Sequence, residues 1–131
     1  MPKPPGLRVL VVDDNRDAVE TLAMLLGLWG HDVRLAADGP SALETAAAHR
    51  PDVVLLDISL PGMSGYEVAE RLRATPELRE TVLVAMTGYG QAEDKKETRE
   101  AGFNLHLVKP VEPDVLQKLL VDLAATRSGS A

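Results

Sequence analysis

The sequence contains no cysteine and very few aromatic residues, and these absences narrow the classes of protein that it can encode. Without cysteine the chain can form neither disulfides nor thiolate metal sites, and we expect a cytoplasmic protein. Aromatic residues make up only 3% of the chain. The core must therefore be built mainly from leucine, valine, alanine and methionine.

Long apolar runs and an excess of positive charge are also missing. No apolar run approaches the roughly 18 to 20 residues needed to cross a bilayer. The opening segment "MPKPPGLR" lacks the apolar centre of a signal peptide. A net charge of -6 argues against nucleic-acid binding, which requires clustered lysine and arginine. We therefore expect no contact of this chain with nucleic acid or with a membrane.

The 131 residues are enough for one domain with short flanking segments. Hydrophobic residues at 45% and charged residues at 26% are typical of a globular protein. The prolines in residues 1–6 predict an extended linker. The closing letters "ATRSGSA" predict a disordered tail over residues 126–131. Residues 7–125 then form the folded domain.

Short apolar runs alternate with helical patterns along the whole domain. We expect strands at residues 7–12, 32–36, 52–56, 81–85 and 104–108. We expect helices at residues 15–29, 40–49, 64–74, 91–101 and 113–125. Continuous apolar strands are typical of parallel strands with helices on both faces. With right-handed crossovers, this order predicts an α/β fold with an open, doubly wound parallel sheet.

Polar side chains directly follow four of the expected strands. Asp13 and Asp14 follow the first strand, Asp57 the third, Thr87 the fourth and Lys109 the fifth. Ligands of such sheets bind outside the carboxyl ends of the strands. If the first and third strands are neighbours, the carboxylates crowd together and a divalent cation would relieve their repulsion. Oxygen ligands favour Mg²⁺ over zinc, and the lysine suits an incoming anion.

Each of these residues by itself has a purely structural explanation. An Asp-Asp pair after a strand commonly caps a helix, and a lysine before a proline is commonly a surface residue. Thr87 by itself fits a turn or a cap. Their occurrence together, at the ends of four strands, favours a functional site.

From about Arg8 to Ala124 the chain resembles the receiver domains of bacterial two-component response regulators, the CheY-like proteins. The resemblance rests on the acidic pair Asp13-Asp14 and on the segments "LLDISLPGMSG", "MTGYG" and "LVKP". It implies a flavodoxin-like (βα)5 fold with strand order 2-1-3-4-5.

The resemblance also implies a phosphoacceptor and a metal site. Asp57 would accept a phosphoryl group from a phosphohistidine on a histidine kinase or on a histidine phosphotransfer protein. Asp14, Asp57 and the backbone carbonyl of Ser59 would bind Mg²⁺, and Asp13 would act through a metal-bound water. Ser59 and Tyr89 would flank the site and tune the lifetime of the phosphoryl group.

Further residues acquire roles through the same resemblance. Lys109 would contact one phosphoryl oxygen and Thr87 another, and a cis peptide bond would precede Pro110. On phosphorylation, Thr87 would move inward and the residue at position 106 would rotate behind it. That residue is usually aromatic, but here it is His106. The change would reshape the surface of the fourth helix, fifth strand and fifth helix, where a downstream protein docks.

Other classes of function fit the sequence less well. A haloacid-dehalogenase-type phosphatase would also use an aspartate nucleophile with Mg²⁺, but it requires a second aspartate where Ser59 stands. A nucleotide or flavin binder would need a glycine-rich phosphate loop, which is absent. A receiver that has lost its acceptor chemistry would lack residues that are present here. We therefore expect a signalling domain that catalyses only its own phosphorylation and dephosphorylation, either stand-alone or part of a hybrid histidine kinase.

Overall fold

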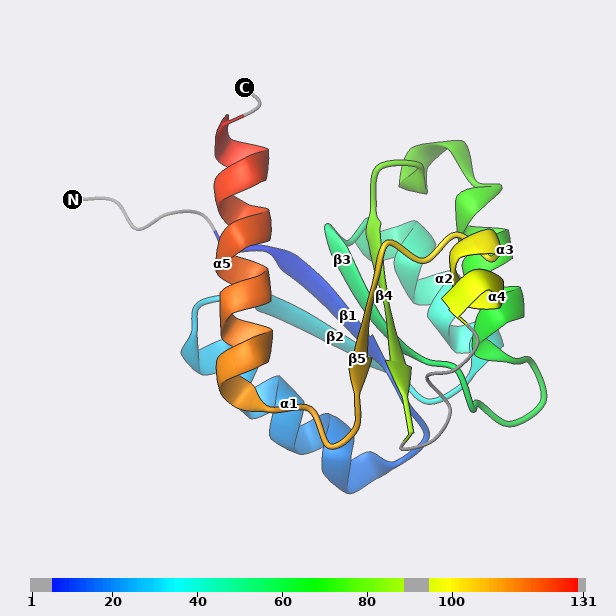
Figure 1. Cartoon of the computed structure of the whole chain (residues 1–131), viewed down its shortest axis with the longest axis horizontal. Helices are drawn as coiled ribbons and strands as arrows, with labels where there is room; N and C mark the ends of the chain where they lie inside the picture. Colours follow the sequence, from blue (N-terminus) through cyan, green and yellow to red (C-terminus); the bar gives the residue numbers. More distant parts are fainter. Residues whose placement is uncertain (1–5, 89–94, 130–131) are drawn as a thin grey trace.

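The computed structural model describes residues 6–88 and 95–129, in which strands and helices alternate (Figure 1). The strands are β1 (Arg8–Val12), β2 (Asp32–Ala36), β3 (Val53–Asp57), β4 (Val82–Thr87) and β5 (Leu105–Val108). The helices are α1 (Arg16–Leu28), α2 (Gly39–His49), α3 (Gly65–Arg73), α4 (Lys95–Glu100) and α5 (Pro113–Gly129), with a 3-10 turn, η1 (Pro76–Leu78), after α3.

The strands form one parallel sheet in the order β2-β1-β3-β4-β5, which confirms the expected fold class and strand order. β1 pairs with both β2 and β3, so the strand order reverses at this point. Val12, the last residue of β1, lies opposite Leu56 of β3. This register brings the residues after β1 level with Asp57 at the end of β3.

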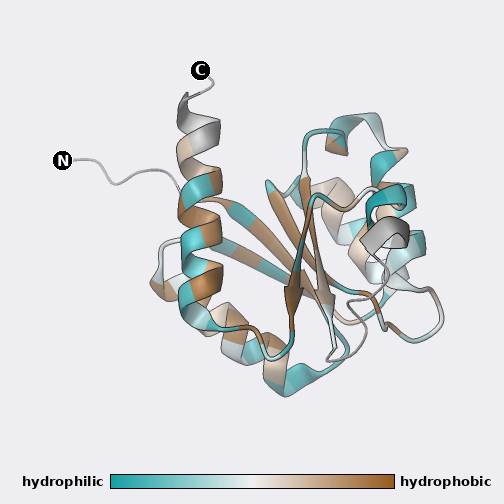
Figure 2. Ribbon diagram, viewed as in Figure 1, coloured by the Kyte–Doolittle hydropathy of each residue, from teal (hydrophilic) through white to brown (hydrophobic). Residues whose placement is uncertain are grey.

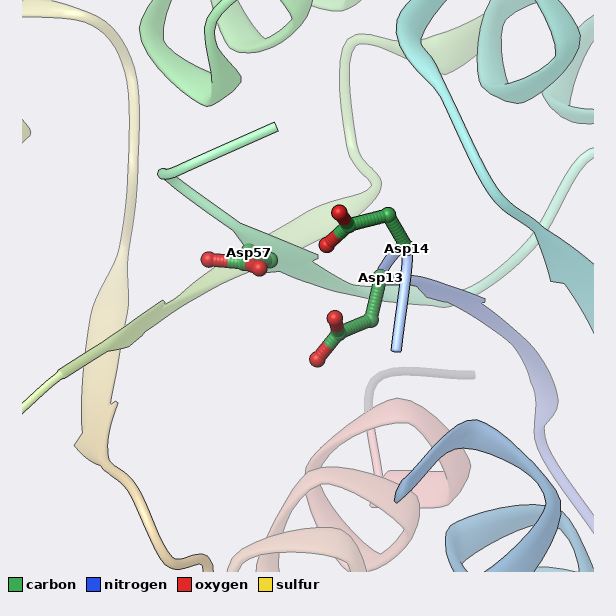
Figure 3. A group of neighbouring side chains, drawn as sticks. All are labelled: Asp13, Asp14 and Asp57. Atoms are coloured by element: carbon green, nitrogen blue, oxygen red, sulfur yellow. The ribbon is translucent and has the colours of Figure 1, made fainter. Parts of the chain in front are cut away.

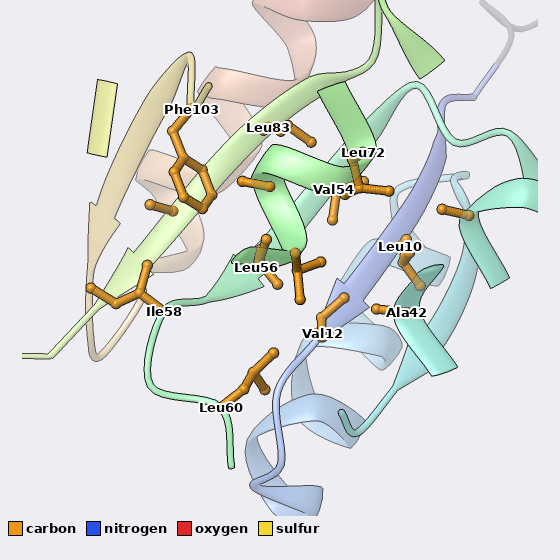
Figure 4. Packing of buried hydrophobic residues seen from close by; sticks show 14 of the residues in the cluster. Leu10, Val12, Ala42, Val54, Leu56, Ile58, Leu60, Leu72, Leu83 and Phe103 are labelled. Atoms are coloured by element: carbon orange, nitrogen blue, oxygen red, sulfur yellow. The ribbon is translucent and has the colours of Figure 1, made fainter. Parts of the chain in front are cut away.

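Helices cover both faces of the sheet, with α1 and α5 on one side and α2 and α3 on the other (Figure 1). Each side buries its own apolar cluster. The cluster between the sheet and helices α1 and α5 includes four leucines of these helices, Leu22, Leu26, Leu116 and Leu120. Leu10, Val54, Leu56, Val68 and Leu72 belong to the cluster under α2 and α3 (Figure 4).

The central strand β3 is buried at all five of its positions, from Val53 to Asp57. Apolar residues accordingly dominate the middle of the sheet in the hydropathy view (Figure 2). Fully burying one leucine or valine side chain contributes about 1.5–3 kcal/mol. The strand that carries Asp57 is therefore anchored firmly, and its last side chain is held at a fixed place on the sheet edge.

Side chains in the connecting loops cap the N-termini of three helices. The side chains of Asn15, Asp38 and Ser64 accept hydrogen bonds from the backbone N–H groups of Ala18, Ser41 and Glu67, at 3.2, 2.9 and 3.2 Å. Such caps satisfy N–H groups that have no partner within the helix. They define where α1, α2 and α3 start after their strands. The Ser64 cap confirms the helix start that the sequence predicts there.

The end of the last helix differs from the prediction. α5 continues to Gly129, four residues beyond the predicted end at Ala125, so the predicted tail is wrong for residues 126–129. The physical reason is that "ATRS" contains no helix breaker, and the first residue of low helix propensity is Gly129 itself. Residues 130–131 lie outside the described part of the chain.

Two other predictions fall partly outside the described ranges. The predicted linker, residues 1–6, is described only at Gly6. The helix predicted for residues 91–101 is observed as α4 from Lys95 to Glu100, whereas residues 91–94 are not described. In the described part of the chain, every helix is too short or too polar to span a bilayer.

Candidate functional site

Asp13 and Asp14 follow the end of β1, but only the first of them is buried. The Asp13 backbone N–H donates to the carbonyl of Ala36 at 3.1 Å, which extends the pairing of β1 and β2 by one residue. The carboxylate oxygen Oδ1 of Asp13 accepts a hydrogen bond from the backbone N–H of Asn15 at 3.0 Å. Asp14 is exposed. The first carboxylate is thus fixed by the backbone, and the second faces solvent.

Asp57 is the last residue of β3, and it is only 4% exposed. Its Oδ1 accepts a hydrogen bond from the backbone N–H of Ser59 at 2.9 Å. The backbone of Gly65, at the start of α3, packs on the carbonyl of Asp57, because a Cβ at Gly65 would lie 2.6 Å from that oxygen. The carboxylate is therefore oriented by the loop that follows it, a constraint that the sequence pattern did not indicate.

The three carboxylates converge at one point (Figure 3). Each of Asp13, Asp14 and Asp57 offers an oxygen atom, and these atoms lie within 4.8 Å of one another. This confirms the predicted crowding at the edge where β1 and β3 are neighbours. Hard oxygen donors in such an arrangement fit a divalent cation such as Mg²⁺, and the exposed Asp14 leaves the group open to solvent. The acidic cluster can therefore hold a metal ion.

Lys109 reaches the same cluster from the loop after β5. Its Nζ lies 2.7 Å from Oδ2 of Asp13 and 3.1 Å from Oδ2 of Asp57. Burial of the ammonium acts to lower the pKa of Lys109, but the hydrogen bonds to Asp13 and Asp57 and the negative charges of these carboxylates together outweigh it, and the pKa is raised. Lys109 is thus a fixed cation at neutral pH. The peptide bond to Pro110 is cis, as the resemblance predicted.

Thr87 closes β4 beside the cluster and is 2% exposed. Its hydroxyl donates to the carbonyl oxygen of Leu107 at 3.4 Å. Its own carbonyl accepts a hydrogen bond from the backbone N–H of Lys109 at 2.7 Å. Thr87 therefore ties the end of β4 to β5 and to the backbone of the lysine.

His106 lies on β5, opposite Ala85 of β4, and is exposed. A cavity of about 190 Å³ lies beside it and also reaches Thr87. The lining residues are Thr87, Thr98, Arg99, Phe103, Asn104, Leu105 and His106. The structure thus brings the two predicted switch residues to one cavity. Tyr89, which the resemblance places at the site, lies outside the described residues.

A second, larger cavity borders Asp13 on the side of α1. It has a volume of about 590 Å³ and reaches from Asp13 and Lys109 to apolar residues of α1 and of the loop before α5. These apolar residues include Leu22, Leu25 and Val111. The site therefore opens onto this cavity at Asp13 and Lys109.

The chain is similar to known proteins over most of its length. The family described as response regulator receiver domain matches residues 9–121. Over 109 residues the chain is 37% identical to the response regulator PleD of Caulobacter vibrioides, an alignment that covers 83% of this chain and 24% of PleD.

Solved structures agree with this similarity. The chemotaxis response regulator CheY4 of Vibrio cholerae has a TM-score of 0.84 and 32% identity, covering 90% of this chain and 98% of that one. The receiver domain of sensor histidine kinase PA1611 from Pseudomonas aeruginosa PAO1 has a TM-score of 0.82 and 31% identity, covering 92% and 98%. That structure holds a magnesium ion coordinated in its active site cleft.

The comparisons favour one of the classes that the sequence left open. They give no support to a haloacid-dehalogenase-type phosphatase, whereas the family match covers the acidic cluster and every strand except the first residue of β1. The chain spans about a quarter of the length of PleD, so the likeness concerns one domain of that protein. The chain belongs to the response regulator receiver domain family.

Proposed function

We propose that this domain accepts a phosphoryl group on Asp57 and acts as a switch in a two-component phosphorelay. The observation that carries the proposal is the placement of Asp57, with Lys109 Nζ 3.1 Å from its Oδ2 and two further carboxylates within 4.8 Å. Phosphoryl transfer depends mainly on positioning and charge neutralisation, and these residues supply both. The donor we propose is a phosphohistidine of a histidine kinase or of a histidine phosphotransfer protein.

In the proposed reaction a carboxylate oxygen of Asp57 attacks phosphorus. The new P–O bond forms while the P–N bond to the donor imidazole breaks, and the electron pair of that bond leaves with the nitrogen. Lys109, protonated and held beside Asp57, pairs with a phosphoryl oxygen. The buried position of Asp57 at the end of β3 limits its movement during the attack.

We propose Mg²⁺ as the cofactor. Asp14, Asp57 and the backbone carbonyl of Ser59 would hold the ion, and Asp13 would act through a bound water. The ion would supply charge neutralisation for the phosphoryl oxygens.

For the switch we propose Thr87 and His106. Thr87 can donate to a phosphoryl oxygen only by giving up the carbonyl of Leu107, to which its hydroxyl donates at 3.4 Å. The cavity of about 190 Å³ beside Thr87 and His106 supports the proposal, because it offers room for the imidazole to rotate. A ring chemical shift of His106 that stays fixed on phosphorylation would contradict this role.

The downstream partner is proposed to dock on the surface formed by α4, β5 and α5. Exposed apolar side chains support this, since Leu105, Val108 and Val115 are 40%, 41% and 50% exposed. We propose residues 7–125 as the domain, either a stand-alone regulator or the receiver of a hybrid histidine kinase, in the cytoplasm. It would catalyse nothing beyond its own phosphorylation and dephosphorylation.

The proposal is tested with acetyl phosphate as a small donor, with and without Mg²⁺, followed by intact mass spectrometry. We expect one phosphoryl adduct that depends on Mg²⁺ and is absent in Asp57→Asn. The matched control is Asp122→Asn, because the side chain of Asp122 is 66% exposed on α5 and remote from the cluster. An adduct that persists in Asp57→Asn would refute the assignment of the acceptor.

A further inference from the structure

The loop between β3 and α3 folds back onto the residue at which it begins. A Cβ added to Gly65 would lie 2.5 Å from the Cα of Ile58 and 2.6 Å from the carbonyl oxygen of Asp57. The Gly65 N–H donates to the carbonyl of Ile58 at 3.3 Å. At the start of the loop, the Ser59 N–H donates to the Asp57 carboxylate at 2.9 Å. A displacement of this loop is therefore transmitted to Asp57 from both of its ends.

One side chain in the outer part of this loop is anchored to a different element. Met63 rests on Gly39, since a Cβ at Gly39 would lie 2.8 Å from both the Cβ and the Sδ of Met63. Met63 is half-buried and packs against the core cluster under α2 and α3, while its neighbours Pro61, Gly62 and Ser64 are exposed. The inner part of the loop is attached to the body of the domain through the buried Leu60, and the outer part through Met63.

The surface beneath Met63 is rigid. Gly39 is the buried first residue of α2, and Pro40 lies in the same first turn. The Asp38 carboxylate accepts the Ser41 N–H at 2.9 Å, and this hydrogen bond lowers the pKa of Asp38. A capped helix start with a proline in its first turn has little freedom to move. Contact with Gly39 therefore fixes Met63, rather than the reverse.

We infer that Met63 is a positioning residue for the acceptor site, which it controls by holding the β3–α3 loop against Gly39. A methionine side chain is flexible enough to fill the space that the glycine leaves. Through the loop, this contact sets the Asp57 carboxylate and the Ser59 backbone, the groups that bind the ion and the phosphoryl group. The inference rests on the proposed function of Asp57.

Two substitutions test the contact from its two sides. Met63→Ala removes the anchoring atoms but keeps the Cβ. Gly39→Ala inserts a methyl group 2.8 Å from the Cβ of Met63, which cannot rotate away, so the loop backbone must move. The matched controls are Met24→Ala, at a side chain that is 70% exposed on α1, and Gly27→Ala, where an added Cβ meets no atom within 4 Å.

Each variant is measured in three ways: the Mg²⁺ affinity by calorimetry, the rate of adduct formation with acetyl phosphate, and the urea midpoint of unfolding. We expect Met63→Ala and Gly39→Ala each to slow adduct formation about tenfold. Misplacing reacting groups by ~1 Å can slow a reaction about a hundredfold, and we expect a smaller displacement of the Asp57 carboxylate here. Both should also weaken Mg²⁺ binding, and both controls should match the wild type in Mg²⁺ affinity and in the rate of adduct formation. The double variant should lose less than the product of the two single losses, since the substitutions act on one contact.

A merely structural role for Met63 predicts a different result. Met63→Ala and Gly39→Ala would then lower the urea midpoint, while the folded proteins kept the wild-type Mg²⁺ affinity and adduct rate. That outcome would overturn the inference. If instead the wild type itself formed no adduct, the proposed function would fail, and the Mg²⁺ affinities of the variants would still decide whether Met63 positions the carboxylates.

Discussion

Replacing Lys109 by methionine tests how the acidic cluster is held together in the absence of a metal ion. The substitution keeps a side chain of similar length but removes the ammonium that contacts Asp13 at 2.7 Å and Asp57 at 3.1 Å. These carboxylates then lose their cation while they remain beside Asp14. We expect the free energy of unfolding without Mg²⁺ to fall.

The size of the loss follows from burial. The side chains of Asp13 and Asp57 are 2% and 6% exposed, whereas that of Lys109 is 31% exposed. Breaking a fully buried ion pair costs about 3–5 kcal/mol, and an exposed pair contributes up to about 1 kcal/mol. Because water reaches Lys109 but hardly reaches the carboxylates, we expect a loss of about 2 kcal/mol, between these limits. Such a loss is a substantial part of the roughly 5–15 kcal/mol that stabilises a typical domain.

The assay is urea unfolding at neutral pH, in EDTA and in excess Mg²⁺. A cation that binds only the folded state stabilises it in proportion to its affinity. Removing Lys109 leaves the acids without a competing positive charge, so Mg²⁺ should stabilise Lys109→Met more than the wild type. Adduct formation with acetyl phosphate should nevertheless be strongly slowed, because the cation that pairs with the phosphoryl oxygens is gone.

The matched control is Lys118→Met. The side chain of Lys118 is 81% exposed, and its Nζ lies 3.8 Å from Oδ2 of Asp122 on α5. Removing this ammonium should therefore change the free energy of unfolding by less than about 0.5 kcal/mol. If Lys109→Met in EDTA were as stable as Lys118→Met, the carboxylates would not depend on Lys109, and the electrostatic reasoning would be refuted.

Three further predictions concern Gly65 near the site, Gly27 on α1 and His31 at the opposite end of the sheet. Gly65→Ala should destabilise the fold by about 1–3 kcal/mol, because the added methyl group overpacks against the backbone of Asp57, and it should weaken Mg²⁺ binding. Gly27→Ala should stabilise the fold by up to about 1 kcal/mol. Urea unfolding measures the stabilities, and calorimetry measures the Mg²⁺ affinity. The Leu7 N–H donates to Nδ1 of His31 at 3.0 Å, and burial lowers the pKa of His31 below 6.5. The pKa of His31 is lower in the folded state than in the unfolded state, so folding favours the neutral imidazole. The stability that neutral His31 contributes is fully present above pH 6.5 and is lost as the pH falls through the folded-state pKa. As the pH falls from about 7.5, the wild type should therefore lose more stability than His31→Asn, and equal losses would contradict the role of this hydrogen bond.

The periodicity of the sequence was sufficient to predict the strands and the fold class, whereas the strand order came from the family resemblance. The run "VVLL" before Asp57 is apolar at every position, as expected for a strand buried on both faces, and β3 is buried throughout. The helix starts at Asn15 and Ser64 were readable because capping depends on local side chains. The helix end at Gly129 was missed, because the prediction ended the helix at Ala125 although none of the next three residues breaks a helix.

The members of the site were also readable, because each lies at the end of a strand or within two residues after it. Asp13, Asp14, Asp57, Thr87 and Lys109 were identified by their position after apolar runs and by their resemblance to one family. What the sequence pattern could not provide were their contacts. The ion pair of Lys109 with Asp13 joins residues 96 positions apart, and no local pattern reports such a pairing.

The amino-acid sequence by itself determined the order of strands and helices, the class of fold and the residue types at the edge of the sheet, because these depend on spacing along the chain. Only the tertiary structure decided that Asp13 is buried while Asp14 is exposed, that the Thr87 hydroxyl donates to Leu107, and that Met63 rests on Gly39. These features arise where separate elements meet, and the packing between them sets distances that spacing along the chain does not encode.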